Sequence, residues 1–217
     1  MPVLRNGIKK HDNQERETFT KSLKESSCAG IAKWQESNGQ KYLEIISKDH
    51  YTLGRLQGKY LKRQIKKMNF ILKRFVMFYD LKMDEIRSYS KAYEKCIPIQ
   101  YKEELKGVSE VSGVEYDDLL FQVVFLDLFY GQLLPRMESR SFPISAACTA
   151  IGVRDTNNHY VMGQTMDFNP IFSPALSWVK YKVMGANTVF LLKMGIMSLP
   201  IGKNSRVSAT LNLVQTK

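Results

Sequence analysis

Cys148 is the residue of this sequence whose type and neighbours best fit catalytic chemistry. It stands among small residues in "SAACTAIG", and an acid, Asp167, closes the next apolar stretch, "YVMGQTMDF". A thiolate is a strong nucleophile, but it needs a base to remove its proton. The turn signal "DTNN" between the two stretches predicts a β-hairpin, which would bring residue 167 near residue 148 because antiparallel partners share one end. The pattern therefore indicates a thiol and a carboxylate at one end of a hairpin.

Simpler interpretations of these residues compete with this one. A free cysteine is most often a small buried apolar residue, and Cys148 fits that role as well. His159 could serve as the base, but it follows "TNN" in the predicted turn. His11, His50 and His159 are scattered, and none stands with acids at a metal-ligand spacing. The sequence therefore predicts no metal site.

Cysteine use and hydropathy place the chain in a broad class. Cys28, Cys96 and Cys148 have unrelated spacings, which favours neither a zinc site nor a disulfide framework and predicts a reduced, cytoplasmic protein. No apolar run follows the charges of "MPVLRNGIKKHDNQERETF", as it would in a secretory signal peptide. The most apolar segment, 119–135, contains polar residues and is shorter than the ~20 residues that span a bilayer. We expect a buried helix there and no transmembrane segment.

Hydropathy predicts an α+β protein whose first part is mainly helical. Residues 1–40 are polar, which is typical of a loosely held arm or short helices, and "NG" near their end is a turn signal. "KYLEIIS" predicts a short strand at 41–47. Apolar residues then recur at helical spacing and predict one long helix over about 52–79. Further helices are expected before Pro98, up to Gly113 and from Glu115 onward.

The last third of the chain has the pattern of strands. "CTAIGVRD", "HYVMGQTMDF", "SWVKYKV", "TVFLLKM" and "RVSATLNLV" are short and rich in β-branched and aromatic residues, and turn signals separate them. We therefore expect three parts, which are a polar arm at 1–40, a mainly helical part at 41–147 and a run of strands at 148–217.

Several of these motifs together resemble one family. Cys148-Thr149 followed by "GQTMDFNP" is similar to the nucleophile region of autoproteolytic cysteine acyltransferases and hydrolases related to isopenicillin N acyltransferase, in the N-terminal nucleophile hydrolase superfamily. Upstream, "YTLGRLQGKYLKRQI" resembles the family's paired glycines at the start of a long helix, and "ELKGVSEVSG" resembles its "E-L-x-G-x-(S/A)-E-x-(S/A)-G" segment. Downstream, "KNSRVSATLN" is similar to a hairpin that ends in "N-S-x-G" and then "(G/T)-L-N". The resemblance covers about residues 41–215, with the motifs in the family's order.

The resemblance implies a fold and a reaction. The fold would be the αββα sandwich of N-terminal nucleophile hydrolases. In that family the precursor cuts itself before the nucleophile, and the freed α-amine, which titrates near ~8, becomes the base for the thiol. Carried over, the scissile bond joins Ala147 to Cys148, and Cys148 later attacks a substrate amide or thioester. No cofactor is implied, although acyl-coenzyme A could be the acyl donor.

The resemblance also assigns three further residues. Asp167 matches the acid that binds and orients the α-amine. Asn212 matches the asparagine whose amide lines the oxyanion hole. Gln164 stands where bile salt hydrolases carry an arginine, and it is assigned to the surroundings of the site.

The sequence departs from the family pattern in three places. Ala147 stands where the family often has glycine, and its Cβ hinders the strained turn that cleavage needs. "KNSRVSATLN" lacks the glycine after "NS" and is one residue short, which would turn Asn212 to the other face of its strand. Relatives continue well beyond residue 217. We therefore expect a C-terminally truncated sandwich with an open edge, completed by a second polypeptide or another copy, or an inactive relative kept as a binding module.

A basic block gives the alternative of a binding protein. The formal net charge is +11, and the densest block runs from Arg55 to Arg74 without an acid. Such a block could meet nucleic acid or an anionic membrane, but on an amphipathic helix it is more often a solvated face. We therefore expect a small acyl amide or thioester as the partner and no specific nucleic acid.

Overall fold

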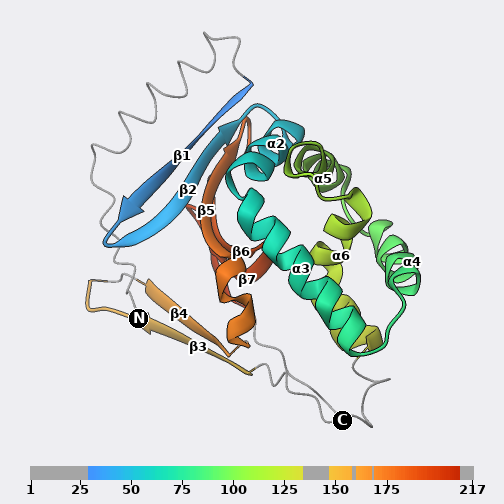
Figure 1. The fold of residues 1–217 in the computed structure, drawn as a ribbon. Coiled ribbons are helices and arrows are strands. Elements are labelled where there is room, and N and C mark those ends of the chain that lie inside the picture. The colour runs from blue at the N-terminus through green and yellow to red at the C-terminus, as the bar shows by residue number, and fades with distance from the viewer. Residues whose placement is uncertain (1–28, 134–146, 158–159, 168, 211–217) are drawn as a thin grey trace.

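One layer of helices covers one face of a six-stranded sheet, and a two-stranded ribbon stands beside that sheet (Figure 1). The computed structural model describes residues 29–133, 147–157, 160–167 and 169–210. The α+β class is confirmed. The strands of the large sheet are, in order across it, β1 (Gly30–Ser37), β2 (Gln40–Ser47), β5 (Leu176–Val183), β6 (Val189–Met194), β7 (Met197–Lys203) and β8 (Ser208–Thr210).

The strand β1 corrects the prediction for the end of the polar arm. Residues 30–37 pair with β2 along the whole strand, from Gly30 opposite Ser47 to Ser37 opposite Gln40. The predicted turn is confirmed, because Asn38 and Gly39 both have positive φ (51° and 75°), as a tight hairpin turn requires. β1 is an edge strand with little burial, so its polar composition hid it. Residues 1–28 of the arm lie outside the described residues.

β7 is absent from the strands predicted by composition, and Pro200 is the reason. A proline cannot donate to a β ladder and is tolerated at edges and bulges. The register between β6 and β7 shifts between Leu191 and Lys193, and Pro200 lies opposite this irregularity. The other predicted strands are confirmed, although β8 covers only residues 208–210 of "RVSATLNLV".

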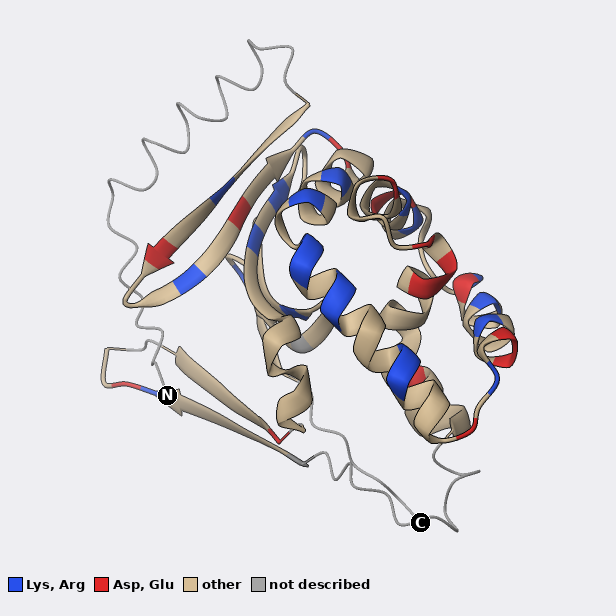
Figure 2. Ribbon diagram, in the orientation of Figure 1, with Lys and Arg blue, Asp and Glu red and all other residues tan. Residues whose placement is uncertain are grey.

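The predicted long helix over 52–79 is wrong, since the structure has two helices there. α2 (His50–Tyr60) and α3 (Lys62–Phe78) meet at Leu61, which has φ −104° and ψ 14°. The apolar spacing does not reveal this break, because Leu61 stands four residues before Ile65 and continues the helical pattern. The side chain of Leu61 is fully buried at the joint. Basic residues occur along both helices (Figure 2), mostly at exposed positions, as an amphipathic helix predicts.

The remaining helices follow the predicted stops. They are α4 (Met83–Glu94), α5 (Ile99–Ser112), α6 (Tyr116–Leu128), one turn of π-helix η1 (Phe129–Leu133) and the 3-10 helix η2 (Pro170–Ala175). Gly113 ends α5 in the left-handed conformation, at φ 72°. Of the described helices, none combines the length and apolar character needed to cross a bilayer.

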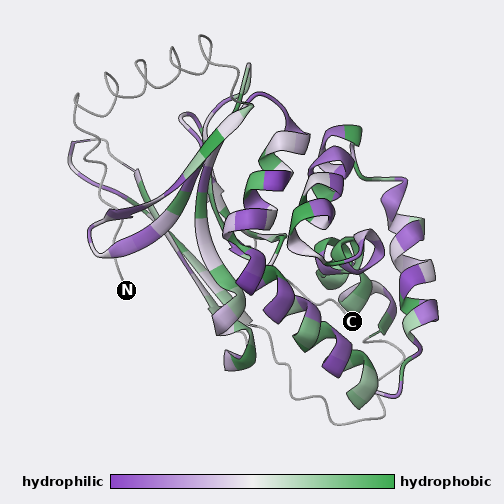
Figure 3. Ribbon diagram, turned by 45° about the horizontal axis from the view of Figure 1, so that its top comes forward, coloured by the Kyte–Doolittle hydropathy of each residue, from purple (hydrophilic) through white to green (hydrophobic). Residues whose placement is uncertain are grey.

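The core lies between the helices and the sheet, and both contribute buried apolar residues to it. Figure 3 shows apolar residues along the helices and the strands. One cluster joins β2 and β5 to α2, α5 and α6 through residues such as Leu43, Leu53 and Val179. A second cluster, rich in phenylalanine, joins α3 and α6 to η1, η2 and β6.

The paired glycines of α2 bring this helix against α5. A Cβ at Gly54 would lie 1.9 Å from the backbone oxygen of Glu104, and one at Gly107 would lie 2.2 Å from the backbone oxygen of Tyr51. Only glycine permits such a close backbone approach. The glycine motif of α2 and the "ELKGVSEVSG" motif of α5 are both part of the family resemblance, and they meet in this one contact between helices.

Candidate active site around Cys148

Cys148 lies at the start of a ribbon formed by β3 (Ala147–Arg154) and β4 (Tyr160–Asp167). The strands pair antiparallel over their whole length, from Ala147 opposite Asp167 to Arg154 opposite Tyr160. The predicted hairpin is therefore confirmed, and the backbone N–H of Asn157 donates to Asp155 Oδ1 (2.8 Å) in its turn.

The register sets the relation between Cys148 and Asp167. Asp167 lies opposite Ala147, while Cys148 lies opposite Met166. Because side chains alternate between the two faces of a strand, the thiol and the carboxylate point to opposite faces of the ribbon. Asp167 is exposed, and its backbone flanks the peptide bond between Ala147 and Cys148. The backbone of Asp167 thus lies beside the predicted scissile bond, and its carboxylate lies on the face of the ribbon away from the thiol.

The thiol face of the ribbon is turned toward the helices. Met166 packs against the phenylalanine-rich core cluster, and Cys148 is a half-buried free cysteine on the same face. Burial raises the pKa of Tyr130, and the charge of Cys148 raises it further. Tyr130 belongs to the π-helical turn η1, and such turns are frequent at functional sites. No sequence pattern that we analysed singled out Tyr130.

The other predicted site residues differ in how far the structure describes them. Gln164 is half-buried opposite Ala150, so its side chain shares the face of Cys148. Asn212 lies outside the described residues. Near it in sequence, the Thr210 hydroxyl donates to Met162 Sδ (3.7 Å) and so links β8 to β4. The side chain of Ala147 is likewise outside the described part of the chain.

His159 lies outside the described residues, but its neighbour Tyr160 pairs with Arg154 at the far end of the ribbon. Arg154 is six positions along the strand from Cys148, a distance of roughly 20 Å. Within the described ranges, no cluster of three His, Cys, Asp or Glu side chains is arranged to hold a metal ion.

The sequence did not predict two buried polar clusters that join elements of the helical layer and the large sheet. In the first, Glu104 Oε1 accepts from Gln57 Nε2 (2.7 Å) and from Lys193 Nζ (3.2 Å), and His50 Nδ1 lies 3.6 Å from Glu104 Oε2. Burial raises the pKa of Glu104, but Lys193, His50 and Gln57 outweigh it and lower this pKa to about 2. The helical spacing of Glu104 with Val108 and Ser112 is the signal that places it on the buried face.

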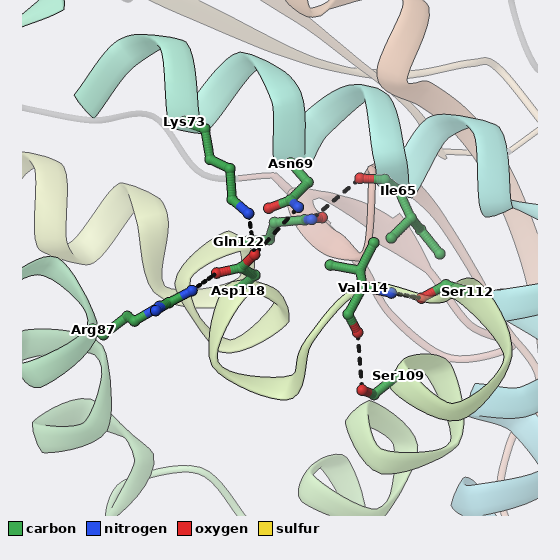
Figure 4. A network of polar contacts seen from close by, with 9 residues as sticks. All are labelled: Ile65, Asn69, Lys73, Arg87, Ser109, Ser112, Val114, Asp118 and Gln122. Carbon is green, nitrogen blue, oxygen red and sulfur yellow. Dashed lines mark hydrogen bonds and ion pairs between the residues drawn. The ribbon is translucent and has the colours of Figure 1, made fainter. Parts of the chain in front are cut away.

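The second cluster surrounds Asp118 in the first turn of α6 (Figure 4). Its carboxylate accepts from Lys73 Nζ (2.6 Å), Arg87 Nη2 (3.0 Å) and Asn69 Nδ2 (3.3 Å), and so ties α3 and α4 to α6. Burial raises the pKa of Asp118, but hydrogen bonds from Lys73 and Arg87 lower it overall. The first cluster thus joins helices to the large sheet, the second joins helices to one another, and Cys148 takes part in none of these contacts.

No protein-family model matches the chain, and no curated protein matches its sequence. The family resemblance therefore stays a prediction from the motifs.

Proposed function

We propose that this chain is an autoprocessed N-terminal cysteine amidohydrolase or acyltransferase. The observation that carries the proposal is the register of the β3–β4 ladder, which puts Asp167 opposite Ala147 and beside the bond to Cys148. A carboxylate at that position lies within reach of an α-amine freed on Cys148. An ammonium group next to a carboxylate is favoured and held in place.

Maturation would be an N-to-S acyl shift. The Cys148 thiol attacks the carbonyl carbon of Ala147, the amide nitrogen leaves as the α-amine of Cys148, and a thioester joins Ala147 to Sγ. Water then hydrolyses the thioester, which leaves a carboxylate on Ala147 and a free thiol on Cys148. The half-buried position of Cys148 leaves the thiol accessible for this chemistry.

The mature reaction would use the same thiol. The α-amine takes the thiol proton, the thiolate attacks an acyl amide or acyl thioester, and the leaving amine or thiol takes up the proton. Water or an amine then accepts the acyl group. Acyl-coenzyme A is one acyl donor of this class. In the resemblance, Asn212 supplies an oxyanion donor and Gln164 stands near the site.

The ribbon itself supports a role for further strands. Ile151, Val153 and Tyr160 are exposed on it, and no other described strand pairs with its edges. An isolated two-stranded hairpin is only marginally stable in water. We therefore place the active form in an assembly where a second polypeptide or another copy adds strands to β3 or β4.

Intact-mass measurement tests the proposal. Wild type should yield a fragment of 70 residues that starts at Cys148 (217 minus 147). Cys148→Ala should stay whole, whereas Cys96→Ala, which removes an exposed free thiol elsewhere, should be cut as wild type is. Chains that stay whole in both wild type and Cys96→Ala, even after co-expression with a strand-supplying partner, would refute the maturation step.

A further inference from the structure

The outer face of α3 combines unpaired positive charge with exposed apolar side chains. Its eight residues are spaced by three, four or seven positions and so share one side of the helix. They are Arg63, Lys66, Lys67, Phe70, Lys73, Arg74, Met77 and Phe78, which we call the α3 face. The helix contains no acid, and its charged positions are all blue, the colour of Lys and Arg, in Figure 2.

The apolar members of the α3 face are unusually open to solvent. Phe70 is 54% exposed, Met77 67% and Phe78 76%. The Phe70 ring is flanked by two cations, since Lys67 Nζ and Arg74 Cζ each lie 5.5 Å from its centroid. Both cations make cation–π contacts with the ring. Because the ring carries no net charge, these contacts leave the positive charges unpaired.

Most of the charge on this face has no counterion among the residues that the structure describes. Lys73 is paired with Asp118 and is therefore not one of the unpaired cations of the face. Among the described residues, no carboxylate lies within ion-pair distance of Arg63, Lys66, Lys67 or Arg74. The face therefore presents four free cations and three apolar side chains along a helix of about 25 Å.

We infer that the α3 face docks on the surface of a bilayer that contains anionic phospholipid. Lys and Arg side chains are attracted to anionic headgroups, while Phe and Met side chains enter the boundary with the acyl chains. Duplex nucleic acid would satisfy the charges but would leave Met77 and Phe78 without an apolar partner. The association is peripheral and does not depend on the reaction at Cys148.

Vesicle sedimentation of the full chain tests this inference. The probes are vesicles of phosphatidylcholine alone and vesicles of phosphatidylserine and phosphatidylcholine in equal parts. Wild type should bind the anionic vesicles and not the neutral ones. Each neutralised cation should weaken binding about fivefold, so the triple variant Arg63→Gln, Lys66→Gln, Arg74→Gln should bind about 100-fold more weakly.

Matched variants separate the α3 face from the rest of the surface. The triple variant Phe70→Ser, Met77→Ser, Phe78→Ser should lose the binding that persists in about 0.5 M sodium chloride, where charges are strongly screened. Two control triples change equally exposed positions elsewhere and should bind as wild type does. They are Ile99→Ser, Met184→Ser, Val207→Ser and Lys41→Gln, Lys95→Gln, Arg206→Gln. Circular dichroism establishes that each variant is folded.

Three results would overturn the inference. The first is the absence of binding to anionic vesicles, and the second is equal loss in the control triples. The third is displacement from the vesicles by inorganic phosphate or by a fluorescent oligothymidylate at matched ionic strength, which would assign the face to free phosphate or to nucleic acid.

Discussion

Glu104 of α5 and Lys193 of β6 form a buried ion pair, with 3.2 Å between Oε1 and Nζ and less than 9% of either side chain exposed. Lys193→Met alone would leave a buried carboxylate without its cation. We expect it to lower the free energy of unfolding by about 3–5 kcal/mol. Urea denaturation measures this value. The double variant Glu104→Gln, Lys193→Met should recover most of the loss, and a single variant as stable as wild type would contradict the role of the pair.

The carboxylate of Glu104 also makes the stability of the fold depend on pH. The pKa of Glu104 is about 2 in the folded protein and 4.5 in its ordinary state. A lowered carboxylate pKa stabilises the fold fully above pH 4.5, and this contribution is lost as the pH falls from 4.5 toward 2. It amounts to about 3 kcal/mol. Urea midpoints between pH 7 and pH 3 should fall for wild type, and the fall should be smaller in Glu104→Gln, where the lowered pKa of Asp118 still acts.

Gly54 should not tolerate a side chain. Gly54→Ala would place Cβ against the backbone of α5, where no side-chain rotation can relieve the overlap, so α2 and α5 must separate. We expect a loss of about 3 kcal/mol or more, measured by thermal and urea unfolding. Gly152→Ala is the control, because a Cβ there meets no atom within 4 Å, and it should leave stability nearly unchanged.

Asp167→Asn tests the carboxylate beside the predicted cut. If Asp167 holds the α-amine as ammonium, its loss should slow alkylation of the mature Cys148 thiol at neutral pH, because less ammonium remains beside the thiolate to stabilise it. The rate of reaction with iodoacetamide as a function of pH measures this. Asp155→Asn, at the other end of the ribbon, should keep the wild-type profile, and identical profiles for all three proteins would exclude this role for Asp167.

Local signals predicted much of this fold. Gly113 ends a helix, Asn38-Gly39 makes a hairpin turn, and "DTNN" connects the strands of the Cys148 ribbon, because each depends on the conformations its own residues favour. The edge strand β1 was missed because it has few buried positions to impose an apolar pattern.

The sequence predicted less of the site, because the missing parts depend on contacts between distant segments. The hairpin indicated that Asp167 and Cys148 are neighbours, but only the register shows that they lie on opposite faces. The coupling of Tyr130 to Cys148 and the pairing of Glu104 with Lys193 join residues far apart in the chain. No local pattern contains such pairs.

The parallel ladder between β2 and β5 has a consequence for a chain cut between Ala147 and Cys148. β1 and β2 would belong to the first fragment, whereas β5 to β8 would belong to the second, and six residue pairs from Tyr42–Trp178 to Ser47–Val183 join them in mid-sheet. The buried Glu104–Lys193 pair crosses the same boundary. The two products would therefore stay together as a noncovalent heterodimer and separate only on unfolding.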